Sequence, residues 1–462
     1  EVRISMQNEA SSTARLSFGL ATSEGDVTTW DFGVQISHAN AAHDYYTVHR
    51  RIHSASSGAG SLNNPIATAP PERVWTGGGT DNLWSTSVNW GGTVPSEGEP
   101  LLFGLAARQA NFNDLPELLT PALTFTNDGF VLDGNTLSVG ESINNLAGSN
   151  TIQLSLDLPV SGAKHWQIAA GSVLHLSGIS SWTTSGDHIM DGGGTLHLTG
   201  ALDISANNPP WVLREGRFVI AGGSFSSLGG FRIGSSASTL APIETVVTDG
   251  GSITLSVPAA NLRVGDGAPH APSRLIVDNG TVSLQGGLIG LPYVGECTGE
   301  VWQTGGWVKD AYVVYSYHAA GHGTYAVTNG ILEPFQIRRD SAGGTAIMRF
   351  NNAQLRPALG ADGANFMRGL DEAEIQSGGL TIDATTDVTI AQALSGAGGL
   401  TKINFYTVAL TGANSYAGNT LIQEGKLGLP TTQTNAAGIQ VAAGAELEVT
   451  RVTTASTLTA GS

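Results

Sequence analysis

The sequence predicts an all-β fold, a parallel β-helix preceded by a small antiparallel β unit. Glycines recur roughly every 20–30 residues, each followed by a short apolar run, and such a period is typical of solenoids and arrays. Glycine accounts for 62 of 462 residues, about twice the usual share. Charged residues make up only 13%, about half the usual share, which favours short strands and tight turns over surface helices. The glycine series comprises Gly171, Gly194, Gly223, Gly251, Gly280, Gly306, Gly330, Gly379, Gly399, Gly425 and Gly444.

The acidic composition argues against some partners. The formal net charge is −17, whereas nucleic acids and anionic membranes select basic surfaces. Carboxylates on an acidic surface could also hold divalent cations such as calcium. Cys297 is the only cysteine, so the chain forms no internal disulfide. No apolar run reaches the length of a membrane-spanning helix. Because the chain starts at Glu1 rather than Met, we expect a processed product or a segment of a longer polypeptide.

The first residues differ from the rest in pattern. Residues 1–53 contain four runs of alternating polar and apolar residues, which is typical of half-buried antiparallel strands. We therefore expect a small antiparallel β domain here. Residues 54–73 are rich in Ser, Gly, Asn, Ala and Pro, a composition that predicts a linker.

Residues 74–119 are predicted to cap the start of the solenoid. Trp75, Trp84 and Trp90 fall within sixteen residues, and three large rings need a place to bury their surface. A cap is the favoured interpretation, because a terminal turn otherwise exposes apolar core and strand edges. The alternative is an exposed platform that stacks on glycans.

From residue 120 to residue 462 the pattern predicts the β-helix itself. Short β-rich runs alternate with Gly, Asn, Asp or Pro, so each turn would place alternate apolar residues inward. About 4.8 Å separates neighbouring strands, so roughly fourteen turns would form a rod near 65 Å long. Helical spacing is scarce, and residues 370–376 are the best candidate for a helix.

Residues 370–430 carry the most specific pattern in the chain. A Gly-Gly-Leu-Thr-Lys run at 398–402 is followed by Thr-Gly-Ala-Asn-Ser-Tyr-Ala-Gly-Asn-Thr at 411–420 and Gly-Lys-Leu at 425–427. This segment resembles the autotransporter-associated β-strand repeat. One departure is Asn404-Phe405-Tyr406, where the repeat usually has glycines. The matching positions are Gly379, Gly399, Leu400, Thr401, Lys402, Gly412, Asn414, Tyr416, Gly418, Thr420, Gly425 and Leu427.

The resemblance implies a right-handed parallel β-helix, export across a membrane, and display at the bacterial cell surface or release outside the cell. It implies no catalytic activity. In true autotransporters an outer-membrane barrel follows such repeats.

Parallel β-helices also include enzymes, so a catalytic role depends on whether suitable side chains can meet in one site. The cluster nearest to a lyase site consists of Asp187, His188 and Asp191, and residues 338–340 (Arg-Arg-Asp) could supply a base. The two groups are about six turns apart, roughly 30 Å, and cannot share a site. Adjacent carboxylates such as Asp371 and Glu372 point to opposite faces of a strand. We therefore expect no catalytic site.

Some sequence motifs resemble metal-binding motifs, but each of them also has a structural explanation. His318 and His322 have a zinc-like spacing, but the glycines between and after them predict a loop. Asp249, Asn279 and Asn329 are each followed by glycine, and these dipeptides resemble fragments of calcium-binding loops. Tight turns explain them better. His175 and His197 occupy matching positions and would stack as a structural ladder.

An aromatic band is the best binding candidate. Six large rings occur within 24 residues, and they could fill the core, contact a neighbouring subunit or stack on sugars. The residues are Trp302, Trp307, Tyr312, Tyr315, Tyr317 and Tyr325.

These observations predict a non-enzymatic extracellular structural protein, a β-helical stalk, adhesin body or self-assembling surface or fibre component. Its expected partners are copies of itself or other surface proteins. Two alternatives remain, a glycan-binding adhesin that uses the aromatic band and a polysaccharide lyase or hydrolase of the β-helix class. The predicted location is extracellular or on the bacterial surface, with no cofactor required.

Overall fold

The computed structural model divides into two units, residues 1–70 and 71–462. In the first unit it describes four strands, which pair as two antiparallel couples, β1 (Ile4–Met6) with β2 (Leu16–Phe18) and β3 (Thr29–Phe32) with β4 (Arg50–His53). These pairs agree with the predicted antiparallel unit. Residues 54–70 of the expected linker lie outside the described residues. In the second unit the description covers residues 71–449 except 160, 182–184, 205–209, 236–240, 259, 268–271, 294–295, 318–320 and 430–437.

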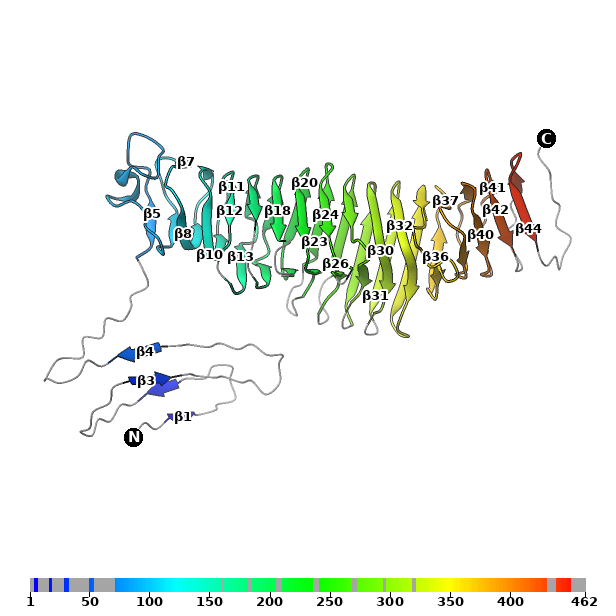
Figure 1. Cartoon of the computed structure of the whole chain (residues 1–462), viewed down its shortest axis with the longest axis horizontal. Helices are drawn as coiled ribbons and strands as arrows, with labels where there is room; N and C mark the ends of the chain where they lie inside the picture. The colour runs from blue at the N-terminus through cyan, green and yellow to red at the C-terminus, as the bar shows by residue number, and fades with distance from the viewer. Residues whose placement is uncertain are drawn as a thin grey trace. The chain divides into compact units, whose positions relative to one another are not determined.

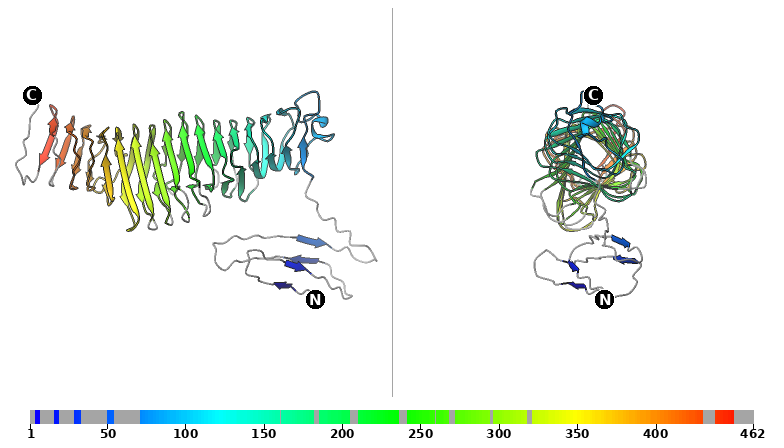
Figure 2. Two further views of the ribbon diagram at one scale, coloured as in Figure 1. Left: turned by 180° about the vertical axis from the view of Figure 1, so that it is seen from behind. Right: turned by 90° about the vertical axis from the view of Figure 1, so that its left-hand side faces the viewer.

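The second unit is a parallel β-helix of about 14 turns, which confirms the predicted fold (Figure 1). A typical turn has three strands, one on each of three faces, which we call faces A, B and C. Strands β13, β14 and β15 form one such turn, and β16, β17 and β18 stack on it in parallel. Viewed along the axis, the turns superimpose around a common interior (Figure 2).

Face A carries a strand in nearly every turn. Four of these strands, β8, β10, β30 and β32, are long and begin on face C before they bend onto face A. The strands are β5 (Arg73–Trp75), β6 (Leu101–Phe103), β8 (Leu118–Phe125), β10 (Leu137–Asn145), β13 (Lys164–Ile168), β16 (His188–Asp191), β19 (Trp211–Leu213), β22 (Phe231–Ile233), β25 (Leu262–Val264), β28 (Leu288–Leu291), β30 (Trp307–Tyr315), β32 (Ile331–Arg339), β35 (Met367–Arg368), β38 (Val388–Ile390), β40 (Thr407–Leu410), β42 (Lys426–Leu429) and β44 (Glu446–Val449).

Faces B and C complete the turns, and face B is a separate 12-stranded sheet. It contains β7 (Ala110–Asn113), β9 (Val131–Gly134), β11 (Ser149–Ile152), β14 (Val173–Leu176), β17 (Thr195–Leu198), β20 (Arg217–Ala221), β23 (Ile243–Thr248), β26 (Ser273–Asp278), β29 (Thr298–Gln303), β31 (His322–Thr328), β33 (Thr345–Asn351) and β36 (Glu372–Ile375). Face C adds β12 (Leu156–Asp157), β15 (Ile179–Ser181), β18 (Ala201–Ile204), β21 (Ser224–Ser227), β24 (Ser252–Leu255), β27 (Thr281–Ser283), β34 (Ala353–Leu355), β37 (Leu380–Asp383), β39 (Leu400–Ile403), β41 (Thr420–Ile422) and β43 (Ile439–Val441).

The interior is filled by ladders of apolar side chains that run along the axis. Alternate residues of each strand point inward, because successive side chains of a strand face opposite ways. On face B, for example, Leu174, Leu196 and Phe218 are register partners in successive turns, and all three are fully buried. Ladders of this kind form one continuous core from the first turn to residue 429.

Six of the recurring glycines lie at corners between faces B and C, namely Gly223, Gly251, Gly280, Gly306, Gly330 and Gly379. Asp249, Asn279 and Asn329 have positive φ angles of 52°, 58° and 58°, so the tight-turn interpretation of these steps is confirmed. Gly280, which follows Asn279, serves a different need. A Cβ on Gly280 would lie 2.6 Å from Val247 Cγ1 of the preceding turn. The side chain is therefore absent because the turns pack too closely to admit one.

The turns change construction after residue 380. Leu380, Leu400 and Thr420 are register partners, so each of these turns takes only 20 residues. They have strands on faces C and A, and an irregular segment replaces the strand of face B. The helix considered at residues 370–376 is wrong, since strand β36 occupies that position. In β36, buried and partly exposed residues alternate, as they do in a strand, although the spacing of the apolar residues also suits a helix.

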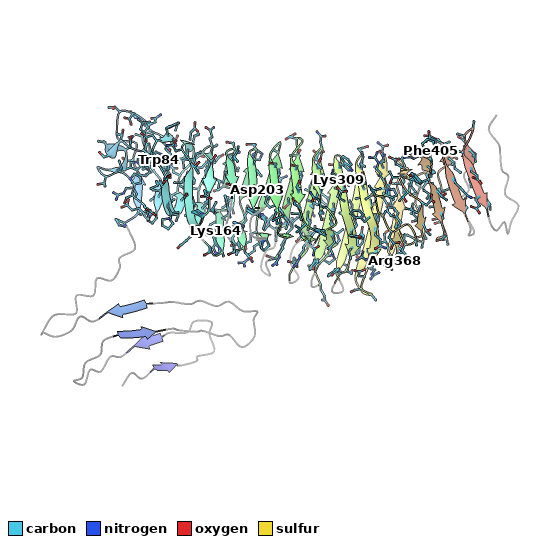
Figure 3. All side chains as sticks on the ribbon, in the orientation of Figure 1. Trp84, Lys164, Asp203, Lys309, Arg368 and Phe405 are labelled. Carbon is cyan, nitrogen blue, oxygen red and sulfur yellow. The ribbon has the colours of Figure 1, made fainter. Side chains whose placement is uncertain are left out.

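The tryptophan-rich segment lies at the N-terminal end of the second unit (Figure 3). Parallel pairing already begins at β5, and the short 3₁₀ helix η1 (Ser87–Trp90) folds over the first turn. Trp75 and Trp84 are fully buried and pack edge-to-face on Trp90, with ring centroids 5.0 and 5.4 Å away. Each indole N–H donates a hydrogen bond within the segment. Buried rings cannot stack on a sugar, so the cap interpretation fits this segment.

We predict that Trp84→Ala destabilises the first turns by about 3–5 kcal/mol, the usual cost of deleting a buried aromatic side chain. Turns of a solenoid contact only their neighbours, so the effect should stay local. Amide hydrogen exchange should therefore accelerate in β6 and β8 but not in β37. Val88→Ala, at a residue 56% exposed, is the matched control. Equal acceleration along the whole solenoid would contradict the capping role.

Candidate functional site

Lys402 of the repeat motif is buried, and its side chain bonds to the backbone of two successive turns. Its ammonium group donates to the carbonyl oxygens of Ile403 at 3.0 Å and Glu424 at 2.9 Å, and also to that of Asn404. Burial lowers the pKa of Lys402, and the nearby carboxylates oppose this effect. The lysine therefore joins one corner to the corner of the next turn. Its ammonium group is bonded to backbone carbonyls and does not face the surface.

Asn414 and Tyr416 substitute for the missing strand of face B. Asn414 is fully buried, where its Oδ1 accepts from the Leu394 N–H at 2.9 Å and its Nδ2 donates to the Gly412 carbonyl at 2.9 Å. Tyr416 fills the core beside it, and its hydroxyl lies 2.7 Å from Thr420 Oγ1. These side chains hold an irregular segment in register without a β ladder.

The remaining motif residues also have structural positions. Leu400 and Leu427 belong to the core. A Cβ on Gly412 would lie 2.6 Å from Ala393 N, and one on Gly399 would lie 2.5 Å from the Asn419 carbonyl oxygen. Thr401 alone points outward with partial exposure. The motif as a whole thus encodes the close stacking of 20-residue turns.

The six residues of the aromatic band do not form one strip. Tyr315 and Tyr325 are fully buried, and their hydroxyls donate to the Ile347 carbonyl and to Gln303 Oε1, both at 3.0 Å. Trp302 points outward on face B and is 37% exposed. Trp307 lies on face C, with Lys309 Nζ 4.6 Å from its ring centroid.

The other two tyrosines lie on or beside face A. Tyr312 packs on Phe335, with ring centroids 5.3 Å apart. Tyr317 stacks on Tyr293 of the preceding turn, with ring centroids 4.8 Å apart. The Arg263 guanidinium lies 3.9 Å from the Tyr293 ring centroid. Core packing thus accounts for two of the six rings, and the other four are divided among separate surfaces.

A ladder of alternating charge runs along the outside of face B. Arg217, Glu244, Arg274 and Glu300 occupy the same register position in four successive turns. The ion pairs measure 3.4 Å from Arg217 to Glu244, and 3.4 and 2.7 Å from Arg274 to Glu244 and Glu300. Burial opposes the charge of Arg274, but its bonds to both glutamates prevail and raise its pKa. Its guanidinium also lies 4.3 Å from the Trp302 ring centroid.

The fold separates the side chains of the candidate catalytic cluster at residues 187–191. His188 points into the core and stacks on Trp211, with ring centroids 6.3 Å apart. Burial, together with the charge of Lys164, lowers the pKa of His188 to about 3. Asp191 lies outside, 4.0 Å from His165. Arg338 is paired with Asp340 at 2.7 Å, six turns further along face A. The predicted separation of the two groups is confirmed.

The metal candidates are separated or only partly described. His175 and His197 pack at 5.1 Å between ring centroids, which confirms the predicted ladder. His318 lies outside the described residues, and His322 Nδ1 is 3.0 Å from Thr345 Oγ1. Within the described residues no three His, Cys, Asp or Glu side chains are grouped closely enough to hold a metal ion.

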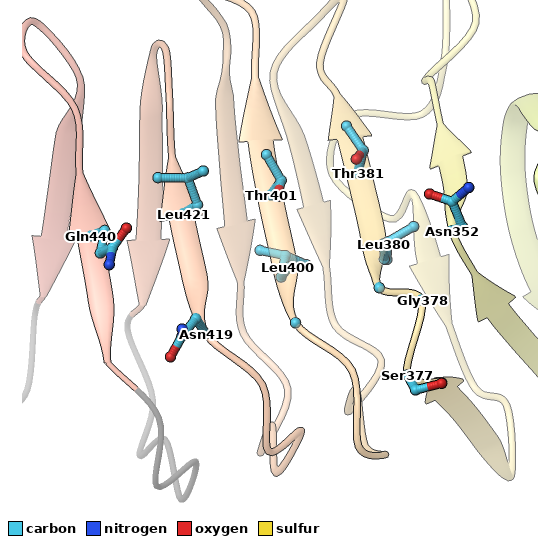
Figure 4. A pocket seen from close by; sticks show the side chains of 12 residues that line it. Asn352, Ser377, Gly378, Leu380, Thr381, Leu400, Thr401, Asn419, Leu421 and Gln440 are labelled. Atoms are coloured by element: carbon cyan, nitrogen blue, oxygen red, sulfur yellow. The ribbon is translucent and has the colours of Figure 1, made fainter.

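One open groove crosses the last turns on face C (Figure 4). Its cavity volume is about 350 Å³, and it passes over the starts of β37, β39 and β41. Sequence reasoning missed it, because its walls come from residues about 20 positions apart. The 12 lining residues are Asn352, Ser377, Gly378, Gly379, Leu380, Thr381, Gly399, Leu400, Thr401, Asn419, Leu421 and Gln440.

Comparison with family models, with curated proteins and with solved structures finds no match to this chain. Among the described residues there is no helix with the length and apolar character needed to cross a membrane.

We predict that Lys402→Met destabilises the turns from β39 to β42 by about 1–3 kcal/mol, because the methionine fills similar space but leaves three carbonyl groups unpaired. Faster hydrogen exchange in these strands would report the change. Lys309→Met, at a partly exposed lysine on the outer surface, is the control and should cost less than about 0.5 kcal/mol. An equal effect of both substitutions would refute the turn-joining role.

We also predict that His188 makes stability fall with acidification. Its pKa is about 3 in the folded chain and about 6.5 when unfolded, so between these values the unfolded state binds more protons and stability decreases as pH falls. The loss should be about 2 kcal/mol between pH 6.5 and pH 5. Denaturant titrations of His188→Phe should show a shallower pH dependence than the parent chain. The exposed-site control His165→Phe should keep the parental slope, and an unchanged slope in His188→Phe would disprove the prediction.

Proposed function

We propose that this chain is the rigid β-helical body of a non-enzymatic protein of the bacterial surface, a stalk or adhesin body related to proteins with autotransporter-associated repeats. Copies of itself or other surface proteins are its proposed partners, and no cofactor is needed. The observation that carries the proposal is the axial pairing of charged side chains from Arg217 to Glu300. These groups hold successive turns together, whereas an active site requires groups that converge on a substrate.

A second ladder supports the same interpretation on face C. Arg356 lies between the carboxylates of Glu333, at 3.6 Å, and Asp383, at 2.7 Å, so it couples three turns. Burial raises the pKa of Glu333, although Arg356 opposes this shift. Individual pairs of this type stabilise weakly, but a series along one face stiffens the stack of turns.

The resemblance at residues 370–430 supports the surface location. Its Lys402, Asn414 and Tyr416 hold turns together, as expected if these three residues serve to extend a solenoid. For the adhesin alternative, Trp302 is the best supported residue of the aromatic band, since its ring is 37% exposed beside Arg274. For the enzyme alternative, the carboxylates of Asp340 and Asp383 are already occupied by arginines.

The location is tested on the bacterium that encodes the chain. Antibodies raised against the solenoid should label intact cells or the culture medium, and added protease should remove the cell-bound signal. A cytosolic control protein should remain unlabelled and intact. Labelling that requires permeabilised cells would contradict the surface proposal.

The non-enzymatic role is tested separately with the purified chain. Neutral and acidic polysaccharides, incubated with and without a calcium chelator, should yield no new reducing ends or unsaturated products above a heat-denatured control. Product formation that a single substitution such as Asp191→Asn abolishes would establish the enzyme alternative instead.

A further inference from the structure

The groove on face C is a fixed feature of how the turns pack. Its floor includes Gly378 and Gly399, where backbone replaces side chains. A Cβ on Gly378 would lie 2.5 Å from Asn351 Oδ1, and one on Gly399 would lie 2.5 Å from the Asn419 carbonyl oxygen. Neighbouring turns therefore exclude side chains at these positions, and the hollow persists along the axis.

The groove presents a regular polar row. Thr381, Thr401, Leu421 and Gln440 are register partners in four successive turns, and Figure 4 shows the first three in line on neighbouring strands. The outward positions of Thr381, Thr401 and Leu421 are partly exposed. The row thus offers hydroxyl and amide groups for hydrogen bonds and one apolar side chain for a C–H face.

None of the 12 lining residues is charged. Binding of a phosphate or uronate polymer would require cations to compensate the desolvated charge, and the net charge of −17 repels polyanions. The groove therefore favours a neutral ligand that forms many hydrogen bonds.

The spacing of the row distinguishes between polymers. Equivalent side chains recur once per turn, about 4.8 Å apart, whereas side chains on one face of an extended peptide recur about every 6.6 Å. A peptide lying along the groove would fall out of register within two turns. A pyranose ring in an extended polysaccharide advances the chain by nearly one turn spacing, so successive sugars can meet equivalent threonines.

We propose that this groove binds a neutral polysaccharide that lies along the solenoid axis, with about one sugar ring per turn between Asn352 and Gln440. The threonine hydroxyls and the Asn419 side chain bond the sugar hydroxyls, and Leu421 contacts an apolar ring face. This site is distinct from the aromatic band, and it does not depend on where the protein is located or on its role as a stalk.

The test uses the full 462-residue chain in affinity gel electrophoresis, with gels that contain a soluble β-glucan, an α-mannan, a galactan or polygalacturonate. Retardation is expected with at least one neutral polymer and not with polygalacturonate. The double variant Thr381→Val, Thr401→Val should raise the dissociation constant about tenfold, because it removes two hydroxyls at nearly constant shape. The control double variant Thr254→Val, Thr389→Val changes partly exposed threonines outside the groove and should alter binding less than twofold.

Circular dichroism melting checks that both double variants fold, and Thr401→Ser, which keeps the hydroxyl, should retain binding. The proposal is overturned by any of three results. The first is that no neutral polymer retards the protein. The second is that only polygalacturonate retards it. The third is that binding to a neutral polymer survives the groove variant but disappears in Trp302→Ala.

Discussion

The structure depends on one constraint, the stacking of parallel strands in register at about 4.8 Å. Each residue of the solenoid meets its equivalents in the turns before and after it, so a side chain is acceptable only if it packs against a near copy of its own environment. Apolar ladders such as Leu174, Leu196 and Phe218 satisfy this requirement directly. In the ladder from Arg217 to Glu300, the charges satisfy it by alternating in sign from turn to turn.

The same constraint decides how polar groups enter the interior. A buried polar group must be hydrogen-bonded, and the equivalent position in the next turn rarely supplies the right partner. Lys402, Asn414 and Tyr325 therefore bond to corner carbonyls, irregular backbone or a neighbouring glutamine. Lys402 and Asn414 lie in the 20-residue turns that depart from the regular three-strand plan, and they fix the geometry that the ladder alone does not specify.

Much of the fold could be predicted from the glycine period, because the glycines mark corners, and at several of them, such as Gly251 and Gly280, neighbouring turns leave no room for a side chain. The division into faces could not. Trp307 and Tyr312 are five residues apart but lie on different faces, since β30 bends at Asp310, whose φ is 57°, and shifts register there. Alternation likewise sends His188 inward and leaves Asp191 outside. Proximity in the sequence therefore predicted the aromatic band and the acidic cluster poorly.

Function in such a molecule follows from repetition along an axis rather than from convergence at a point. Residues that could meet in space are about 20 to 30 positions apart in the chain, as Thr381 and Thr401 are, and no local motif announces them. A surface built in this way presents the same group at a constant interval. It is suited to ligands that also repeat, and a polymer extended along the axis gains a contact with every turn that it crosses, so weak individual hydrogen bonds add to a useful affinity.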